Sequence, residues 1–299
     1  MIGRPTCLDL IGGPRLKSIS VRAVRTLKVL RREIALIRSR GESLALVPTM
    51  GALHDGHLAL VKLAKKKADR AVVSIFVNPK QFAPHEDFSR YPRREADDIA
   101  KLAAVAADLV WLPRPAEMYP ANFATRIAPE GAAQDLETEF RPHFFGGVTT
   151  VVAKLLNQVT PDLAIFGEKD FQQLTVIKQL VRDLDMPVKV VGAPTTRARD
   201  GLALSSRNAY LSDAERQIAP ALIQILRDTA DRARRGGNIH QIRADATLGL
   251  LQAGFTKVDY VDVRDADTLG PYQSKSGRKG RALAAAWLGK TRLIDNVGV

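Results

Sequence analysis

The sequence predicts an α/β fold, in which a mainly parallel sheet is covered by helices and followed by a smaller α+β domain. Three observations support this prediction. Short apolar runs alternate with helical patterns through the first two thirds of the chain, as in proteins with parallel sheets. Two of these runs, at 44–47 and 163–166, lead into a glycine-containing bend with polar residues before a helix. After residue 213 the order changes to helices and then short strands, which indicates a separate domain.

Length and composition are those of a globular protein. With 299 residues, 45% of them hydrophobic, the chain can form one large domain or two ordinary ones. We expect a flexible extension at 1–20, a parallel-sheet domain at 21–195 and a smaller α+β domain at 196–299. No apolar run approaches the length of a membrane span, no signal peptide is expected, and Cys7 is the only cysteine. We therefore expect a cytoplasmic protein with no membrane partner.

The net charge of +13 makes nucleic-acid binding an alternative to small-molecule chemistry. The basic residues are scattered, with clusters at 22–40, 62–70, 227–235 and 275–281. The first three clusters lie on predicted helices, where a solvated face is the usual explanation. A polyanionic small substrate such as ATP would also favour a positive surface. We expect no nucleic-acid partner, and we keep a basic nucleic-acid-binding module as the alternative from another class.

Apolar spacing and breaker residues predict the elements of the first domain in order. A helical stripe predicts a helix at 21–38. A strand at 44–47, a helix from about 55 to 67 and a β-rich run at 71–77 predict a βαβ unit with parallel pairing. Further along we expect a helix at 94–106, a strand at 108–112, a long functional loop or lid at 113–147, a helix at 149–159, a strand at 163–166, a helix at 171–184 and a strand at 188–192.

The second domain is expected to begin with helices. Its periodicity predicts two of them, at 213–235 and 238–253. Three short strands should follow, at 258–263, 281–287 and 292–294, with a basic loop at 273–280 between the first two.

The first glycine-containing bend carries two histidines. His54 and His57 lie three residues apart at the start of a helix, so both face the same side of its first turn. The N-terminus of a helix attracts anions, and two imidazoles there suit a site where negative charge builds up. A zinc-binding helix would have its histidines four residues apart with a glutamate between them, which this sequence lacks. The alternative is that one histidine simply caps the helix or lies on the surface.

The second bend, at 167–170, repeats the order of strand, glycine, polar cluster and helix. Lys169 can neutralise phosphate as a point charge, and Asp170 can accept hydrogen bonds from ribose hydroxyls. The alternative for Asp170 is that it only caps the helix. Gln172 and Gln173 begin that helix, and we expect one of them to face the crevice at the carboxyl ends of the strands.

Two further polar segments are candidates for the same crevice. Gln81 follows the strand predicted at 71–77, and polar side chains at that end of a parallel strand point toward bound ligands. Ser205 and Ser206 stand beside Arg207, and two hydroxyls next to an arginine can clamp a phosphate. Short clusters of serine and arginine also occur by chance, and a loop glutamine is usually surface.

Together these residues closely resemble the pantoate–β-alanine ligase family, over a span from about residue 20 to the end of the chain. The resemblance implies a Rossmann-like sheet with a nucleotidyltransferase-type His-x-Gly-His motif, and a C-terminal α+β lid. It also implies ATP-dependent condensation of (R)-pantoate with β-alanine to pantothenate, AMP and pyrophosphate through a pantoyl adenylate. The matching segments are Pro48-Thr49-Met50-Gly51-Ala52-Leu53-His54-Asp55-Gly56-His57, Phe76-Val77-Asn78-Pro79-x-Gln81-Phe82, Gly167-Glu168-Lys169-Asp170-Phe171-Gln172-Gln173, Ser205-Ser206-Arg207-Asn208 and the tail at 291–296.

The resemblance further implies roles for single residues. The catalytic residues would be His54, His57 and Lys169, with His57 as proton donor and Lys169 at the transferring phosphate. Residues expected to bind ATP are Met50, Gly51, Ala52, Leu53, His54, Asp55, Gly56, His57, Gly167, Glu168, Lys169, Asp170, Thr196, Leu204, Ser205, Ser206 and Arg207. Residues expected to bind pantoate or β-alanine are Gln81 and Gln173, with Asn78 and Tyr91 in a second tier.

The family likeness also implies Mg²⁺ on the ATP phosphates and a homodimer. No protein ligand to the metal is expected, and Asp97 and Asp98 are the acids expected near it. The chain departs from the family pattern at Lys80, where methionine is common, and at His143, which is displaced by one place. A rival within the fold is a nucleotidyl transferase that acts on a phosphorylated acceptor, but the glutamine pair and the large second domain argue against it.

Overall fold

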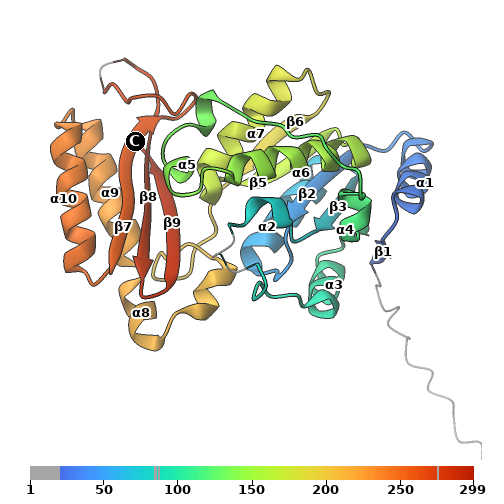
Figure 1. Ribbon diagram of the computed structural model, residues 1–299, viewed down its shortest axis with the longest axis horizontal. Coiled ribbons are helices and arrows are strands. Elements are labelled where there is room, and N and C mark those ends of the chain that lie inside the picture. The colour runs from blue at the N-terminus through green and yellow to red at the C-terminus, as the bar shows by residue number, and fades with distance from the viewer. Residues whose placement is uncertain (1–20, 84–85, 87, 275) are drawn as a thin grey trace, which may run out of the picture.

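The computed structural model describes residues 21–83, 86, 88–274 and 276–299. These residues form a six-stranded sheet and a three-stranded sheet, which lie in two halves of the molecule (Figure 1). The predicted extension at 1–20 lies outside the described residues.

The six-stranded sheet is parallel throughout, with strand order β1-β4-β3-β2-β5-β6. The predicted parallel βαβ unit is confirmed by the pairing of β2 with β3. β2 and β5 are neighbours, so the two glycine-containing bends leave the same edge of the sheet side by side. The strands are β1 (Arg22–Val24), β2 (Leu44–Thr49), β3 (Arg70–Ile75), β4 (Leu109–Trp111), β5 (Leu163–Gly167) and β6 (Lys189–Ala193).

Helices cover both faces of this sheet, which explains why its strands are continuous apolar runs. Along β2, Leu44 and Leu46 join the core on one face, whereas Ala45 and Val47 join the core on the other. The first face packs against α1 (Leu27–Arg38), α6 (Phe144–Val159) and α7 (Phe171–Asp183), and the second against α2 (Asp55–Lys67) and α3 (Glu95–Ala104).

Two helix starts differ from the prediction. The segment predicted as one helix from residue 21 begins as β1, and α1 starts at Leu27 after Thr26, whose side chain accepts from the Val29 N–H. The helix predicted from residue 149 begins at Phe144. Its glycines misled the prediction, since a Cβ on Gly147 would overlap the Lys80 carbonyl oxygen. That glycine lets the turn η1 (Pro79–Gln81) approach the helix closely.

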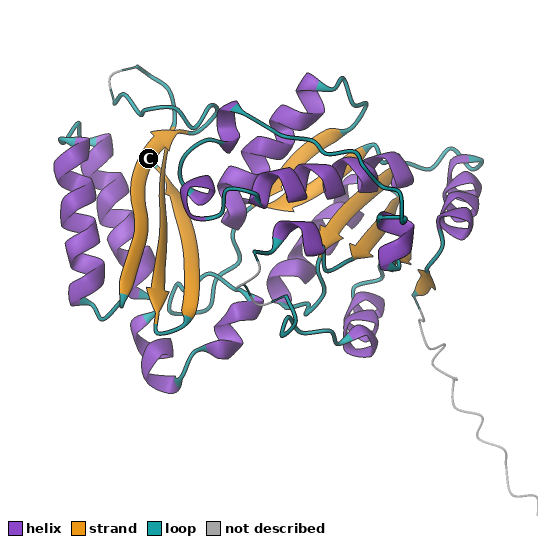
Figure 2. Cartoon of the chain, viewed as in Figure 1, coloured by secondary structure: helices purple, strands orange, loops and turns teal. Residues whose placement is uncertain are grey.

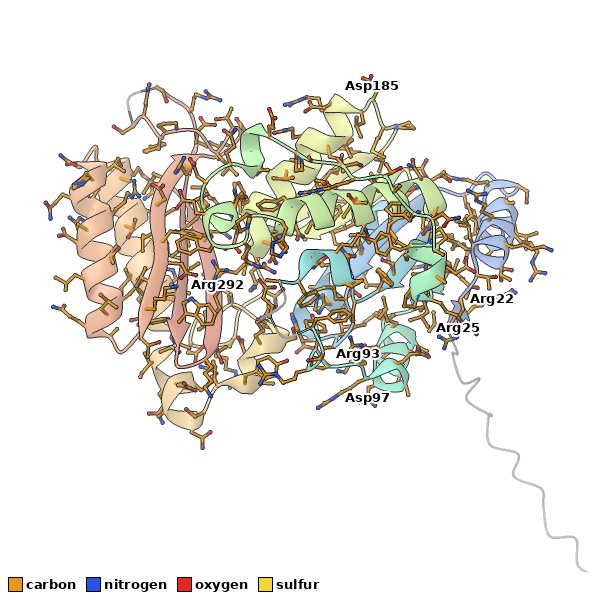
Figure 3. All side chains as sticks on the ribbon, in the orientation of Figure 1. Arg22, Arg25, Arg93, Asp97, Asp185 and Arg292 are labelled. Atoms are coloured by element: carbon orange, nitrogen blue, oxygen red, sulfur yellow. The ribbon has the colours of Figure 1, made fainter. Side chains whose placement is uncertain are left out.

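The long segment predicted as a loop or lid at 113–147 contains three short elements, with irregular chain between them. It contains the helices α4 (Pro115–Met118) and α5 (Glu137–Phe140) and the 3₁₀ turn η2 (Gly131–Ala133). α5 contacts the second domain through Glu137, whose carboxylate accepts from Tyr260 at 2.9 Å and from Arg292 at 2.8 Å. Arg292 therefore lies at the junction of the two domains (Figure 3).

The second domain packs α9 and α10 against one face of an antiparallel sheet of order β7-β8-β9 (Figure 2). The helix predicted at 213–235 is split near Pro220 into α8 and α9. The boundary after residue 195 stays a prediction, and it falls between the end of β6 and the second core. The elements are α8 (Asp213–Ile218), α9 (Ala221–Arg234), α10 (Ile239–Gln252), β7 (Lys257–Asp265), β8 (Gly280–Leu288) and β9 (Thr291–Gly298).

The sheet of the second domain faces the first domain with its other side. In β8 the small residues Ala282, Ala284 and Ala286 pack toward α9 and α10, whereas Leu283 joins the core of the first domain. A strand that alternates in this way is buried on both faces. The second domain is thus packed against the first through a sheet face as well as through polar contacts.

Candidate active site

The two bends, the glutamines and the Ser–Ser–Arg segment surround one cavity of about 220 Å³ at the carboxyl ends of β2 and β5. The predicted site residues that line it are Met50, His54, Gly56, His57, Asn78, Gln81, Tyr91, Gly167, Lys169, Asp170, Gln173, Thr196, Leu204, Ser205, Ser206 and Arg207. Five other predicted ATP-binding residues, all described, do not line this cavity: Gly51, Ala52, Leu53, Asp55 and Glu168. The structure therefore brings the predicted segments together around one cavity, although some of their residues lie behind its wall.

The two histidines are oriented by hydrogen bonds within their own bend. His54 is the N-cap of α2, and its Nδ1 accepts from the Gly56 N–H at 3.1 Å. His57 Nδ1 accepts from the His54 N–H at 3.4 Å, and the centroids of the two rings are 4.1 Å apart. In a neutral imidazole the nitrogen that accepts carries no proton, so the proton of each ring is on Nε2. His54 caps the helix, which was the alternative interpretation of this residue, and it also lines the cavity.

Both imidazoles are held in their neutral form. Burial, and then the charge of Lys169, lower the pKa of His54 to about 4. Burial, the neighbouring His54 and then Lys169 lower the pKa of His57 to about 3. At pH 7 the pair therefore presents N–H donors without carrying charge of its own. The positive charge near the two rings comes from Lys169, from Lys101 and from the N-terminus of α2.

Glycine at position 56 is required by the ring of His54. A Cβ on Gly56 would lie 2.8 Å from the imidazole Cε1 and 2.9 Å from Nδ1. Any other residue would therefore push the ring away from the position in which it caps the helix. The glycine of the His-x-Gly-His motif is thus explained by a steric contact with the first histidine of the same motif.

The backbone of the histidine bend is stabilised by α3. Asp98 is 1% exposed, and its two carboxylate oxygens accept from the Ala52 N–H at 2.9 Å and the Leu53 N–H at 2.8 Å. Lys101 donates to the Leu53 carbonyl at 2.7 Å. The Asp98 carboxylate is thus used for hydrogen bonds to the backbone, and Asp98 does not line the described cavity. Asp97 does not line it either, and its side chain is exposed on the outer side of α3 (Figure 3).

The amide of Gln81 is oriented by Asn78. Asn78, 1% exposed, donates from Nδ2 to Gln81 Oε1 at 3.0 Å and to the Gly147 carbonyl at 3.1 Å. Tyr119 donates to Asn78 Oδ1 at 2.8 Å, and burial raises the pKa of this tyrosine. The Gln81 NH₂ group is then directed toward the Met50 sulfur, at 3.1 Å, and the cavity.

The lysine bend has a different local structure. β5 passes into the 3₁₀ turn η3 (Glu168–Asp170) and then into α7, with Asp170 at its N-cap. Among the described residues the Asp170 side chain makes no capping hydrogen bond, and it lines the cavity instead. A Cβ on Gly167 would meet no described atom within 4 Å, so the backbone there is open to a ligand.

The two glutamines at the start of α7 have separate tasks. Gln173 lines the cavity, as expected of one of the pair. Gln172 is 3% exposed; its amide donates to the carbonyls of Ala132, Gln134 and Asp135 and accepts from the Glu137 N–H. It thereby orders the segment between η2 and α5 rather than contacting a ligand.

The Ser–Ser–Arg segment approaches from the start of the second domain. Ser205 Oγ accepts from the Arg207 N–H at 3.3 Å and begins the turn η4 (Ser206–Tyr210). Ser206 and Tyr91 contact one another through their hydroxyl oxygens at 3.4 Å. Tyr91 thus connects the first domain with the segment that would contact phosphate.

Sequence reasoning missed part of the cavity wall. Val148, Val151, Val152 and Leu155 of α6 form an apolar side, and their helix was predicted without a role in the site. Thr195 lines the cavity, and its hydroxyl oxygen is buried without a hydrogen-bond partner among the described residues. Its only signal in the sequence was its place next to Thr196.

A second cavity of about 350 Å³ adjoins the first and extends between the domains. The two share Met50, Gln81, Lys169, Asp170, Gln173, Ser205 and Arg207. The second cavity continues past Lys257, Lys290 and Arg292 of the second domain. The site is therefore a cleft with one deep end and one end between the domains.

Fold and site define a class of protein: an α/β enzyme that activates a small substrate with a nucleotide in a cleft between two domains. A sequence model of the family described as pantoate–β-alanine ligase matches residues 22–298. A pantothenate synthetase of Bradyrhizobium sp. is 58% identical over 280 residues, which cover 93% of this chain and 98% of that protein. The chain belongs to the pantoate–β-alanine ligase family.

Solved structures of proteins from this family are similar to the chain over nearly its whole length. Pantothenate synthetase from Thermus thermophilus superposes with a TM-score of 0.82 at 44% identity, covering 93% of this chain and 99% of that one. Pantoate–β-alanine ligase from Francisella tularensis, in a complex with a form of ATP and β-alanine, gives a TM-score of 0.76 at 35% identity, covering 93% and 97%. The fold class and the ligase activity expected from the sequence are confirmed. Within the described residues, no helix is both long and apolar enough to cross a membrane.

Proposed function

We propose that the cleft makes pantothenate in two displacement steps. A carboxylate oxygen of pantoate attacks the α-phosphorus of ATP, and the bond to the β-phosphate oxygen breaks to release pyrophosphate. The amine of β-alanine then attacks the acyl carbon of pantoyl adenylate, loses a proton and expels AMP. Both steps need positioning and stabilisation of phosphate charge more than covalent groups of the protein. The observation that supports this proposal most is that the histidine bend, the lysine bend and two glutamines line one cavity.

The phosphate end of the cleft has three kinds of donor. His54 and His57 offer Nε2–H groups from neutral rings, and Lys169 supplies a charge whose effect is larger in a partly buried site. Ser205, Ser206 and Arg207 would contact the β- and γ-phosphates from the second domain. With a pKa of about 3 in the free protein, His57 begins as a hydrogen-bond donor. Bound phosphate would raise that pKa and favour the proton-donor role expected from the family.

The other end of the cleft suits pantoate. Gln81 and Gln173 have amide groups that both donate and accept, which matches hydroxyl groups. Val148, Val151 and Val152 provide an apolar surface for the methyl groups of pantoate. Asn78 would act by orienting Gln81, and Tyr91 by its contact with the phosphate-binding segment.

The nucleoside would lie along the backbone between the two bends. Met50, Gly167, Thr196 and Leu204 line this part of the cavity, and Asp170 is available to accept from ribose hydroxyls. Gly51, Ala52, Leu53, Asp55, Gly56 and Glu168 would contribute by shaping the bends that carry these residues.

Mg²⁺ would enter with ATP, bound to its phosphate oxygens. Among the described residues no group of three His, Cys, Asp or Glu side chains could hold a metal ion. In the proposed complex, phosphate oxygens and water would be the ligands of Mg²⁺. A position near Asp97 or Asp98 stays a prediction, as do the homodimer and the cytoplasmic location. Sedimentation of the purified protein tests the dimer.

The experiment that tests the proposed path uses pantoate labelled with ¹⁸O in its carboxylate. One labelled oxygen should appear in AMP, because the attacking oxygen stays on phosphorus when the amine displaces AMP. AMP should form only when pantoate and β-alanine are both present with ATP. Unlabelled AMP, or AMP formation with ATP alone, would contradict the pantoyl adenylate.

The same preparation tests the rivals. A nucleotidyl transferase acting on a phosphorylated acceptor would consume ATP with that acceptor and ignore pantoate. A nucleic-acid-binding module would bind a DNA duplex or single strand with affinity that falls steeply as salt increases. Tight, salt-sensitive binding without ligase activity would favour the second rival.

A further inference from the structure

The lysine bend is held by a side chain of the second domain. Asn296 on β9 donates from Nδ2 to the Glu168 carbonyl at 2.9 Å and to the Lys169 carbonyl at 2.8 Å. Asn296 is 3% exposed, so both hydrogen bonds are protected from water. They fix the backbone of the two residues that place the Lys169 side chain at the cavity.

The orientation of the Asn296 amide is itself determined. Its Oδ1 accepts from Arg281 Nε at 2.6 Å, which leaves the NH₂ group for the two carbonyls. Arg281 also donates to Glu168 Oε2 at 3.1 Å, and its guanidinium lies 4.2 Å from the ring centroid of Phe171. Arg281 thus contacts Asn296, the side chain of the bend and the helix that follows it.

The lysine bend has no equivalent support from its own residues. Gly167, the N-cap of η3, has no side chain that could cap the turn, and among the described residues the Asp170 side chain makes no capping hydrogen bond at α7. Asn296 is 127 residues away in the chain from Lys169. The carbonyls of Glu168 and Lys169 are therefore held by β9, a strand of the second domain, whereas Gly167 before them pairs with Ala193 of the first sheet.

We propose that Asn296 is a positioning residue for adenylation, acting through Lys169 with its amide aligned by Arg281. This inference rests on the proposed role of Lys169 at the transferring phosphate. The packing of the second domain then sets where the lysine ammonium group lies relative to ATP. A shift of about 1 Å in such a group can lower a rate about 100-fold.

The variant Asn296→Asp tests this with little change in shape. The carboxylate still accepts from Arg281, but it presents an oxygen instead of an NH₂ group to two carbonyl oxygens. We expect single-turnover release of pyrophosphate to fall roughly 10- to 100-fold. Circular dichroism and thermal unfolding should show a folded protein.

A double-mutant cycle separates positioning from a general structural role. In the Lys169→Ala background, Asn296→Asp should lower pyrophosphate release less than about twofold further, because a positioning residue acts only through its target. The same fold loss in both backgrounds, or a normal rate for Asn296→Asp alone, would overturn the inference. Normal pyrophosphate release by Lys169→Ala would instead remove the proposed role of Lys169, and the inference with it.

Two further variants make the test independent of one substitution. Arg281→Lys keeps a positive charge near Glu168 but loses the Nε donor that aligns Asn296, so we expect a loss of about 2- to 10-fold that also vanishes without Lys169. Asp135→Asn is the matched control, because Asp135 pairs with Arg264 across the domains at 3.0 Å without contacting the bend. Its rate should stay within about twofold of the parent protein. A loss in this control as large as in Asn296→Asp would attribute the effect to weakened domain packing.

Discussion

The histidine bend and the lysine bend have the same order of strand, glycine and helix, but they are stabilised from different places. His54 and His57 accept hydrogen bonds from N–H groups within their own bend, and Asp98 of the same domain binds the two N–H groups before them. The carbonyls of Glu168 and Lys169 accept instead from Asn296 of the second domain. The first bend is thus complete within one domain, whereas the second is completed by two.

The two bends also present different chemical groups to the cavity. The histidine bend supplies neutral donors whose direction is fixed by local hydrogen bonds. The lysine bend supplies a point charge on a flexible side chain, whose position depends on how the domains pack. Under the proposed function, the first domain alone would orient the two histidines, whereas the position of Lys169 would depend on hydrogen bonds from the second domain.

The largest expected effect tests whether both bends act on the same phosphate. His57→Ala and Lys169→Ala should each lower the single-turnover rate of adenylate formation by about 10²–10³-fold, as for other donors to developing charge. Pyrophosphate release after rapid mixing with ATP and pantoate measures this rate. A variant that keeps a near-normal rate would remove its residue from the proposed role.

A pair of glycine variants compares the bends directly. Gly56→Ala places a Cβ 2.8 Å from the His54 ring, so it should displace the imidazole and lower adenylation about 10- to 100-fold. Gly167→Ala meets no described atom within 4 Å, so folding should be unchanged and the effect confined to binding of ATP. Steady-state kinetics should show a fall in kcat for the first and a rise in KM for ATP for the second. The opposite assignment would mean that the open space at Gly167 is not used by the nucleotide.

Removing the support of the histidine bend should cost stability as well as rate. Asp98→Asn leaves one of the Ala52 and Leu53 N–H groups unpaired in a buried site. The free energy of unfolding should fall by about 1–3 kcal/mol, and adenylation by less than about tenfold. Urea unfolding measures the first quantity, with the exposed Asp97→Asn expected within about 0.5 kcal/mol of the parent protein as a control. Equal effects of the two variants would contradict the buried role of Asp98.

The smallest expected effect is that of pH on the imidazoles. Their pKa values of about 4 and about 3 in the folded protein mean that both rings stay neutral as pH falls from 8 to about 5. The kcat/KM for ATP should therefore show no histidine titration in that range. Stability should behave differently, because unfolded histidine binds a proton below its ordinary pKa of 6.5. Unfolding free energy should thus decline as pH falls from about 6.5 toward 4. A histidine titration near pH 6.5 in kcat/KM would contradict the buried neutral pair.

The elements that the sequence predicted are those set by residues close together in the chain. The alternation of strands and helices, both glycine-containing bends and the same-side placement of His54 and His57 follow from residues only a few places apart. Errors arose where a distant backbone decided the outcome, as at Gly147, whose glycine serves the close approach of Lys80 rather than the end of a loop. The choice between Gln172 and Gln173 likewise depended on the segment near η2, about which periodicity carries no information.

The sequence by itself determined the family, the two strand–glycine–helix units and the residue types proposed to contact a nucleotide, because these depend on short spacings and side-chain chemistry. Only the tertiary structure decided that Asp98 binds the histidine bend and that Asn296 binds the lysine bend. These contacts join residues separated by 46 and 127 positions. The physical reason is that the packing of α3 against the first sheet and of β9 against the lysine bend, rather than any local pattern, brings these side chains to the backbone groups that need partners.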